Sequence, residues 1–188
     1  MGGGGGDGGI PSRYSAPSKV DDIAKKTEEK SDLINLKNRE TEINKSVEEE
    51  MNKASDKVPW DHNDHSIKHV ERVLEIFPKI IDKFEKISFS KEFLSNRNLS
   101  DLEKEILKYS ILLHDIGYTK SIKDHSLMSK EYIEKLNRGI KKSLLKEIAT
   151  IAQLHTPEGI KQLGGKSLFD LVKKGLISDR IAYLASIL

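Results

Sequence analysis

An apolar helical pattern that ends in His114-Asp115 is the feature that most constrains how this chain can fold. Ser100 is a suitable N-cap for a helix that runs from Asp101 to about Asp115, and Gly117 suits the turn that ends it. Burying a polar pair on so apolar a helix is costly unless the pair has a partner. The pattern therefore predicts a central helix with a binding site at its C-terminal end.

The sequence after Val58 predicts further helices and no strand. Apolar residues recur at helical spacing, and capping or breaking residues separate the segments. The predicted helices lie from Ile67 to Phe84 with Pro78 as a kink or break, from about Asp124 to Leu136, from about Lys142 to His155 before Thr156-Pro157, around Ser167–Lys173, and after Ser178. The expected fold class is all-α, a bundle of five or more helices joined by short loops.

Two segments precede this helical unit, which we place at residues 58–188. Residues 1–19 are rich in Gly, Pro and Ser and can bury little surface, so we expect them to be disordered. About half of residues 20–57 are charged, and Ile43, Val47 and Met51 repeat every four residues. We expect a charged, partly helical arm that is solvated and partly frayed. The alternative is a docking or coiled-coil arm through which the chain could form an oligomer.

The composition narrows the range of functions. A net charge of +2 with acids and bases interspersed does not indicate nucleic acid as a partner. The absence of cysteine excludes disulfides, thiolate metal sites and cysteine nucleophiles. No apolar run approaches the roughly 20 residues of a membrane span, and the N-terminus does not resemble a secretory signal. We therefore expect a cytoplasmic protein with no membrane partner.

The histidines cluster in the sequence around this helix. All six lie in one stretch of under a hundred residues: His62, His65, His69, His114, His125 and His155. Imidazole nitrogens and carboxylate oxygens are ligands for divalent transition metals, so His114-Asp115 with these neighbours predicts a metal site. His65 and His69 share one helix face. His65 could contact substrate or hydrogen-bond a ligand, whereas His62 is expected to be solvated.

The order of these motifs resembles the HD superfamily of metal-dependent phosphohydrolases. His69 opens a His-x-x-Arg-Val sequence, and His114-Asp115 opens a His-Asp-Ile-Gly sequence, which is the usual signature of that family. His125 and His155 follow in the order expected. Four elements in order make the resemblance specific, and it covers about residues 60–188.

The resemblance implies a metal centre. His69, His114 and Asp115 would bind a first metal, and His125 and His155 would help to bind a second, with Asp115 as a bridge. Histidine ligands favour Mn or Fe over Mg, with Zn as a further candidate. We expect one or two such ions per chain.

The implied function is hydrolysis of a nucleotide-like or other small phosphoester by metal-activated water. Asp115 would serve in catalysis as a metal ligand. Arg72, Lys120 or Lys123 could face the charge that develops on the phosphate. Each has a structural alternative: Arg72 could form only a salt bridge, and the two lysines could simply be solvated.

One ligand that the resemblance implies is missing. The last Asp of the family usually lies in an Ala-Asp-x-x-Asp context, and Leu184–Leu188 resembles the residues that precede it, whereas Asp179 lies too early. The pattern here has no polar last turn, which predicts that the natural domain continues beyond Leu188. Two alternatives therefore stay open: a non-catalytic HD-like module that binds a nucleotide or a protein, and a helical interaction domain with a structural metal or none.

Overall fold

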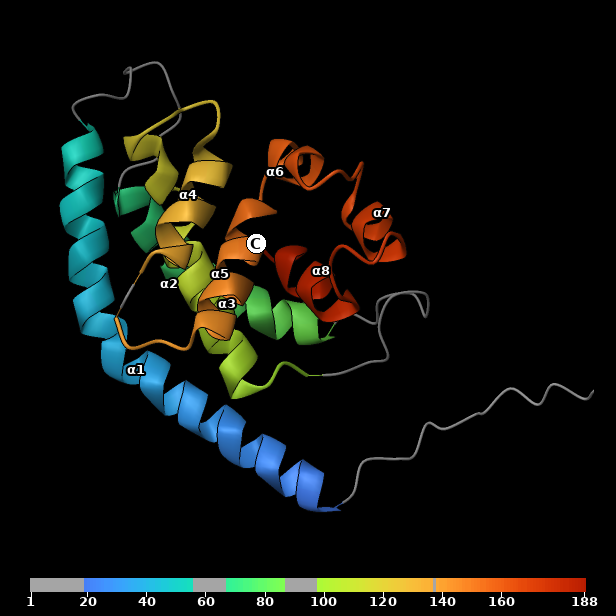
Figure 1. Ribbon diagram of the computed structural model, residues 1–188. Helices are drawn as coiled ribbons and strands as arrows, with labels where there is room; N and C mark the ends of the chain where they lie inside the picture. The colour runs from blue at the N-terminus through green and yellow to red at the C-terminus, as the bar shows by residue number, and fades with distance from the viewer. Residues whose placement is uncertain (1–18, 56–66, 87–97, 137) are drawn as a thin grey trace, which may run out of the picture.

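The computed structural model describes residues 19–55, 67–86, 98–136 and 138–188. Every regular element in these ranges is a helix, which confirms the expected all-α fold class. In chain order the elements are α1 (Lys19–Ser55), α2 (Ile67–Lys86), α3 (Asp101–Leu113), the 3-10 helix η1 (Ile116–Thr119), α4 (His125–Glu134), α5 (Lys142–Gln153), α6 (Pro157–Gln162), α7 (Leu168–Lys173) and α8 (Asp179–Ala185). Figure 1 shows α1 along one side of the other helices. The Gly-rich segment up to residue 18 lies outside the described residues, as do His62 and His65.

Local sequence signals set the start of several helices. Ser100 caps α3 as predicted: its Oγ accepts a hydrogen bond from Glu103 N at 3.2 Å, and Glu103 Oε2 accepts one from Ser100 N at 2.8 Å. This capping box satisfies two backbone donors that have no partner within the helix. Ser178 caps α8 as predicted, because its Oγ accepts from Ile181 N at 3.2 Å.

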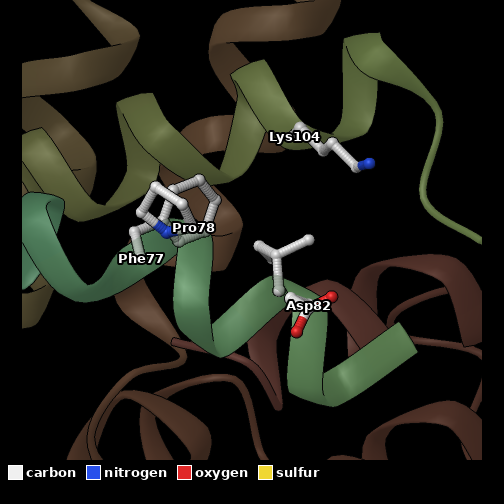
Figure 2. A pocket seen from close by; sticks show the side chains of 5 residues that line it. Phe77, Pro78, Asp82 and Lys104 are labelled. Carbon is white, nitrogen blue, oxygen red and sulfur yellow. The ribbon is translucent and has the colours of Figure 1, made fainter. Parts of the chain in front are cut away.

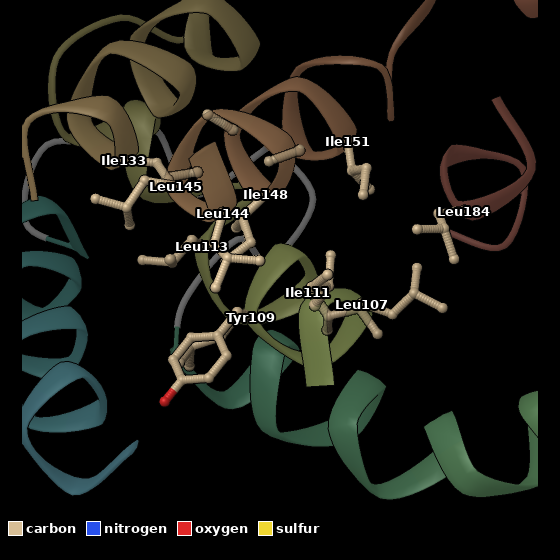
Figure 3. Close-up of a cluster of buried hydrophobic side chains, with 14 of the residues drawn as sticks. Leu107, Tyr109, Ile111, Leu113, Ile133, Leu144, Leu145, Ile148, Ile151 and Leu184 are labelled. Carbon is tan, nitrogen blue, oxygen red and sulfur yellow. The ribbon is translucent and has the colours of Figure 1, made fainter. Parts of the chain in front are cut away.

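The hydrophobic core is built around α3. Ile106 and Leu107 of α3 are fully buried, and they belong to one cluster with Ile148 of α5 and Leu184 of α8 (Figure 3). Burying an aliphatic side chain of this size contributes about 1.5–3 kcal/mol. Core packing on several sides therefore fixes where α3 ends, and His114 and Asp115 follow directly.

Helix α1 differs from the solvated, partly frayed arm that we expect from its sequence. It is helical from Lys19 to Ser55, and Leu36, Ile43 and Val47 are fully buried. The Tyr109 hydroxyl of α3 donates to the carbonyl oxygen of Leu36 at 2.7 Å. Helix α1 changes direction along its length in Figure 1. Helix α1 thus packs against α3 and η1 of its own chain.

Helix α2 carries His69 near its start. Val70, Phe77 and Ile81 of α2 are buried in the core cluster. The helix continues through the exposed Pro78, so a complete break at this position is wrong. Proline removes one backbone hydrogen bond and bends a helix, which is tolerated best where that backbone faces water.

Two helix ends differ in detail from the expectation. The sequence predicts that Thr156-Pro157 stops the preceding helix, but α5 already ends at Gln153 and Thr156 caps α6, its Oγ accepting from Gly159 N at 3.0 Å. Pro157 suits the first turn of α6 because the missing N–H would have no helical partner there. Gly117 does not form a left-handed turn after α3; it lies within η1 and its φ is not positive.

None of the helices in the described ranges is long and apolar enough to cross a membrane.

Candidate metal centre

Asp115 lies where α3 ends and η1 begins. Its side chain is only 2% exposed. His114 is the C-cap of α3, and Asp115 is the N-cap of η1. The C-terminal end of a helix carries partial negative charge, which opposes a carboxylate there. A buried carboxylate in this position therefore requires positive charge or donors close by.

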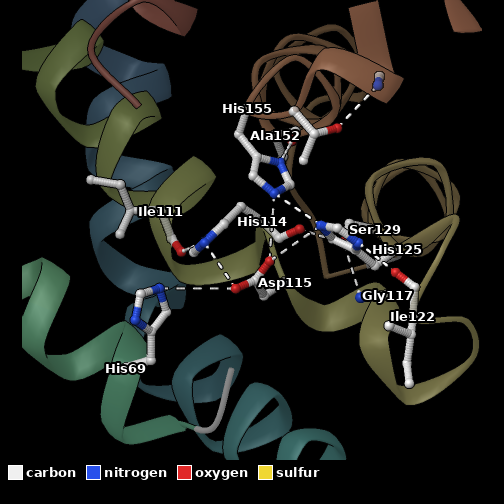
Figure 4. Close-up of polar contacts among 12 residues, drawn as sticks. His69, Ile111, His114, Asp115, Gly117, Ile122, His125, Ser129, Ala152 and His155 are labelled. Carbon is white, nitrogen blue, oxygen red and sulfur yellow. Dashed lines mark hydrogen bonds and ion pairs between the residues drawn. The ribbon is translucent and has the colours of Figure 1, made fainter. Parts of the chain in front are cut away.

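Four histidine rings surround this carboxylate (Figure 4). Nε2 of His114 lies 3.1 Å and Nε2 of His69 lies 4.0 Å from Asp115 Oδ2. Nε2 of His155 lies 3.5 Å and Nε2 of His125 lies 3.7 Å from Oδ1 of the same carboxylate. The rings come from α2, the end of α3, the start of α4 and the turn after α5. The fold thus brings together all five residues that the sequence nominates as ligands.

Three of the rings are fixed by a backbone carbonyl group one turn earlier in the chain. The contacts are His114 Nδ1 to Ile111 O at 2.6 Å, His125 Nδ1 to Ile122 O at 2.8 Å, and His155 Nδ1 to Ala152 O at 2.5 Å. A carbonyl oxygen only accepts hydrogen bonds, so each Nδ1 must carry the hydrogen. In the neutral rings, Nε2 is then left with a lone pair that faces Asp115.

These lone pairs converge on one another. The Nε2 atoms of His125 and His155 are 3.2 Å apart, and both face Oδ1 of Asp115. Three acceptor atoms this close repel one another unless a proton or a cation lies among them. Ligand atoms at about 2.0–2.2 Å from one transition metal lie about 2.8–3.6 Å apart in octahedral or tetrahedral geometry. The observed separations of 3.2, 3.5 and 3.7 Å are close to that range.

Two groups of potential ligands meet at Asp115. One consists of His69, His114 and Asp115, and the other of Asp115, His125 and His155. Within each group the ligand atoms lie within 4.8 Å of one another. Nitrogen and carboxylate oxygen donors in this arrangement fit a divalent cation, so the centre could hold a metal ion.

Asp115 also affects protonation of the centre. Burial lowers the pKa of His114, but the hydrogen bond and the negative charge of Asp115 outweigh burial and raise this pKa above its ordinary value. The carboxylate that would bind a cation therefore also attracts a proton. Metal and proton are expected to compete for the same imidazole.

Ser129 and Gly117 support the centre, a role that no motif in the sequence predicts for either residue. Ser129 of α4 is fully buried; its hydroxyl donates to His114 O at 2.6 Å and accepts from Gly117 N at 2.8 Å. A Cβ at Gly117 would lie 2.0 Å from His125 O and 2.6 Å from Ser129 N. Glycine thus allows α4 to approach Asp115 closely. The clue in the sequence was Gly117, two residues after the His-Asp pair, and the reason for this glycine is the close approach of α4.

Tyr118 of η1 contacts one of the candidate ligands. Its ring stacks on His125, with centroids 4.0 Å apart and planes inclined by 22°. Burial and then the negative charge of Asp115 raise the pKa of the Tyr118 hydroxyl. This stacking restricts rotation of the His125 ring, in addition to the hydrogen bond that its Nδ1 donates to Ile122 O.

The cationic residues nominated for phosphate binding lie on the surface. Arg72 is exposed on α2, one turn after His69. Lys120 is the exposed C-cap of η1, and Lys123 is exposed in the following turn. Asp179 is exposed in the first turn of α8, in keeping with its exclusion as a ligand.

A separate groove of about 350 Å³ lies between α2 and α3 (Figure 2). Its lining consists of Phe77, Pro78, Ile81, Asp82 and Lys104. None of the five candidate ligands is among these residues, so this groove is not the metal centre.

Comparisons with known proteins add no relative for this chain: no family model, no curated protein and no solved structure matches it. The case for function therefore rests on the geometry of the centre and on the motifs of the sequence.

Proposed function

We propose that this chain is a metal-dependent phosphohydrolase of the HD type that acts on a nucleotide-like or other small phosphoester. The observation that carries the proposal is one buried carboxylate, Asp115, within 4.0 Å of four imidazole Nε2 atoms. The order His69, His114-Asp115, His125 and His155 along the chain supports the same family. Asp115 could bridge two ions because each of its oxygens faces a different pair of rings.

Access to solvent favours a reactive site over a structural one. Structural metal sites are closed by four protein ligands, whereas catalytic sites keep a position open. The His69 side chain is 33% exposed, while those of His125 and His155 are 13% exposed. The centre is therefore buried on one side and reachable on the side of α2. A phosphate group could approach from there.

Each residue has a distinct role in this proposal. A bound divalent cation supplies activation of water and polarisation of a phosphoryl oxygen. The four histidines and Asp115 hold and orient it, and their nitrogen donors favour Mn or Fe, with Zn next, over Mg. Arg72 lies one turn after His69 on α2, and Lys120 lies five residues after Asp115. Their positive charge would stabilise the negative charge that develops on the phosphate.

The test combines metal content with turnover. Purified protein, made without chelators, would be assayed for bound metal by elemental analysis and for hydrolysis of p-nitrophenyl phosphate, bis(p-nitrophenyl) phosphate and a panel of nucleotides. We expect metal-dependent turnover that Asp115→Asn abolishes and Arg72→Ala weakens. Arg39→Ala on α1 is the matched control and should keep wild-type turnover.

The outcomes separate the rival functions. Bound metal without turnover of any substrate would favour the non-catalytic binding module. No metal in the wild-type protein, even after incubation with Mn, Fe or Zn, would refute the proposal.

A further inference from the structure

We infer that the two halves of this centre differ in affinity and that one of them binds a divalent cation first. The inner half is Asp115 Oδ1 with His125 and His155; the outer half is Asp115 Oδ2 with His69 and His114. The inference is that the inner half is filled first. It rests on the proposed metal centre and adds an order of binding to it.

Distances within the two halves differ. In the inner half the three ligand atoms are 3.2, 3.5 and 3.7 Å apart, which is close to the spacing around a single ion. In the outer half His114 Nε2 is 3.1 Å from Oδ2, but His69 Nε2 is 4.0 Å away. The outer half must move His69 inward before all its ligands reach one ion.

The most exposed of the four rings, His69, belongs to the outer half, whose other ring, His114, is 9% exposed. The side chains of His125 and His155 are 13% exposed, whereas that of His69 is 33% exposed. Water screens charge more at the exposed site, and it competes more with the ligand there. A cation therefore gains more from Asp115 and the two histidines of the inner half.

Both inner histidines, like His114 of the outer half, are held in place before an ion arrives. Their Nδ1 atoms bond to Ile122 O and Ala152 O, so the tautomer and the ring plane are already those of a ligand. A ligand set that is already ordered loses less conformational entropy on binding.

Tyr118 acts in this inference as a positioning residue for the inner half. Its ring stacks on His125 at a centroid distance of 4.0 Å, and it has no ring contact with His69 among the contacts that the structure describes. Loss of the stacking ring should therefore free His125 and weaken the inner half selectively. The phenol hydroxyl is not needed for this effect, so phenylalanine should replace tyrosine.

The experiment is a titration of the metal-free chain with Co(II), followed by calorimetry and by NMR of the histidine ring protons. Rings bonded to Co(II) acquire large contact shifts that rings merely nearby do not, so the contact-shifted signals at the first equivalent identify its ligands without any substitution. We expect the rings of His125 and His155 to respond at the first equivalent and that of His69 only at the second.

Matched variants test the same order by affinity. His155→Ala should weaken the first equivalent by at least about 100-fold, since even residues that only support ligands contribute 10–100-fold. His69→Ala should weaken it by less than about threefold and remove the second equivalent. Tyr118→Leu should weaken the first equivalent about tenfold, and Tyr118→Phe should restore it.

Circular dichroism of each variant checks that it is folded. If the wild-type chain binds Co(II) but the His69 ring responds first, or His69→Ala removes the first equivalent, the order of filling is wrong while the metal centre stands. If the wild-type chain binds no Co(II), both the centre and the order are refuted.

Discussion

The hydroxyl of Ser129 offers the sharpest test of how the His-Asp turn is held. It donates to His114 O at 2.6 Å and accepts from Gly117 N at 2.8 Å, and it is fully buried. Ser129→Ala removes two hydrogen bonds, each worth about 0.5–1.5 kcal/mol net, and leaves the Gly117 N–H without this acceptor. Adding part of the desolvation cost of that donor, we expect a loss of about 2–4 kcal/mol in the free energy of unfolding.

The chain offers a matched control on the same helix. Ser126 is 1% exposed, and its Oγ forms no hydrogen bond with any of the described residues. Ser126→Ala makes the same chemical change at the same depth, so its effect should be within about 0.5 kcal/mol or stabilising.

Urea unfolding in the presence of a chelator measures both effects without a contribution from bound metal. At a slope of about 2 kcal/mol per M, Ser129→Ala should lower the midpoint by about 1–2 M with an unchanged slope. In a separate titration it should weaken metal binding by about 10–100-fold, because the turn that carries His114 and Asp115 loosens. Equal effects of the two serine substitutions would refute the reasoning.

Three further predictions concern packing and protonation. Leu36→Ala should lower the free energy of unfolding by about 2–5 kcal/mol because it leaves a cavity under α1. Ile34→Ala, at a residue that is 51% exposed, should lower it by less than about 1 kcal/mol, and urea unfolding compares the two variants. Gly117→Ala should force α4 away, since the new Cβ meets His125 O at 2.0 Å, and calorimetry should then show weaker metal binding. Gly164→Ala, at an exposed glycine, is the control and should weaken metal binding less. Only metal binding is compared, because the positive φ of Gly164 makes alanine strained there. With chelator present, the raised pKa of His114 stabilises the fold fully below about pH 6.5, and this contribution is lost as pH rises through the folded pKa. With metal bound, the free energy of unfolding should instead fall as pH drops, because protons displace the metal. Unfolding at several pH values, with and without metal, checks that the pH dependence changes sign.

The helices were predictable where the signal was local. Ser100 and Ser178 cap helices because each hydroxyl oxygen accepts a hydrogen bond from the backbone N–H three residues later. This contact needs no other part of the chain. Thr156-Pro157 was ambiguous for the same local reason: the pair is compatible both with the end of one helix and with the start of the next. Only the packing of α6 against α5, where a Cβ at Gly159 would lie 1.8 Å from Gln153 O, distinguishes the two.

Helix α1 was predicted poorly because its sequence is half charged and its apolar residues are sparse. A few fully buried side chains are enough to dock a helix if the surface opposite is complementary, and that surface belongs to α3 and η1. Ion pairs add to the contact, such as Glu42 Oε1 with Arg138 Nη1 at 2.6 Å and Glu40 Oε1 with Lys108 Nζ at 2.5 Å. The four-residue repeat of Ile43, Val47 and Met51 marks the buried face of α1, but it does not identify the surface that covers this face.

The sequence by itself determined the all-α class, most helix starts and the residue types that could bind a metal, because these follow from spacing and side-chain chemistry. The tertiary structure decided which atoms meet. His69 and His155 lie on elements far apart in the chain, and they reach Asp115 only because the core fixes α2, α3 and α5 relative to one another. Side-chain orientation, the Nδ1 anchors and the close approach at Gly117 all depend on that packing, and distances between remote residues are not encoded in any local pattern.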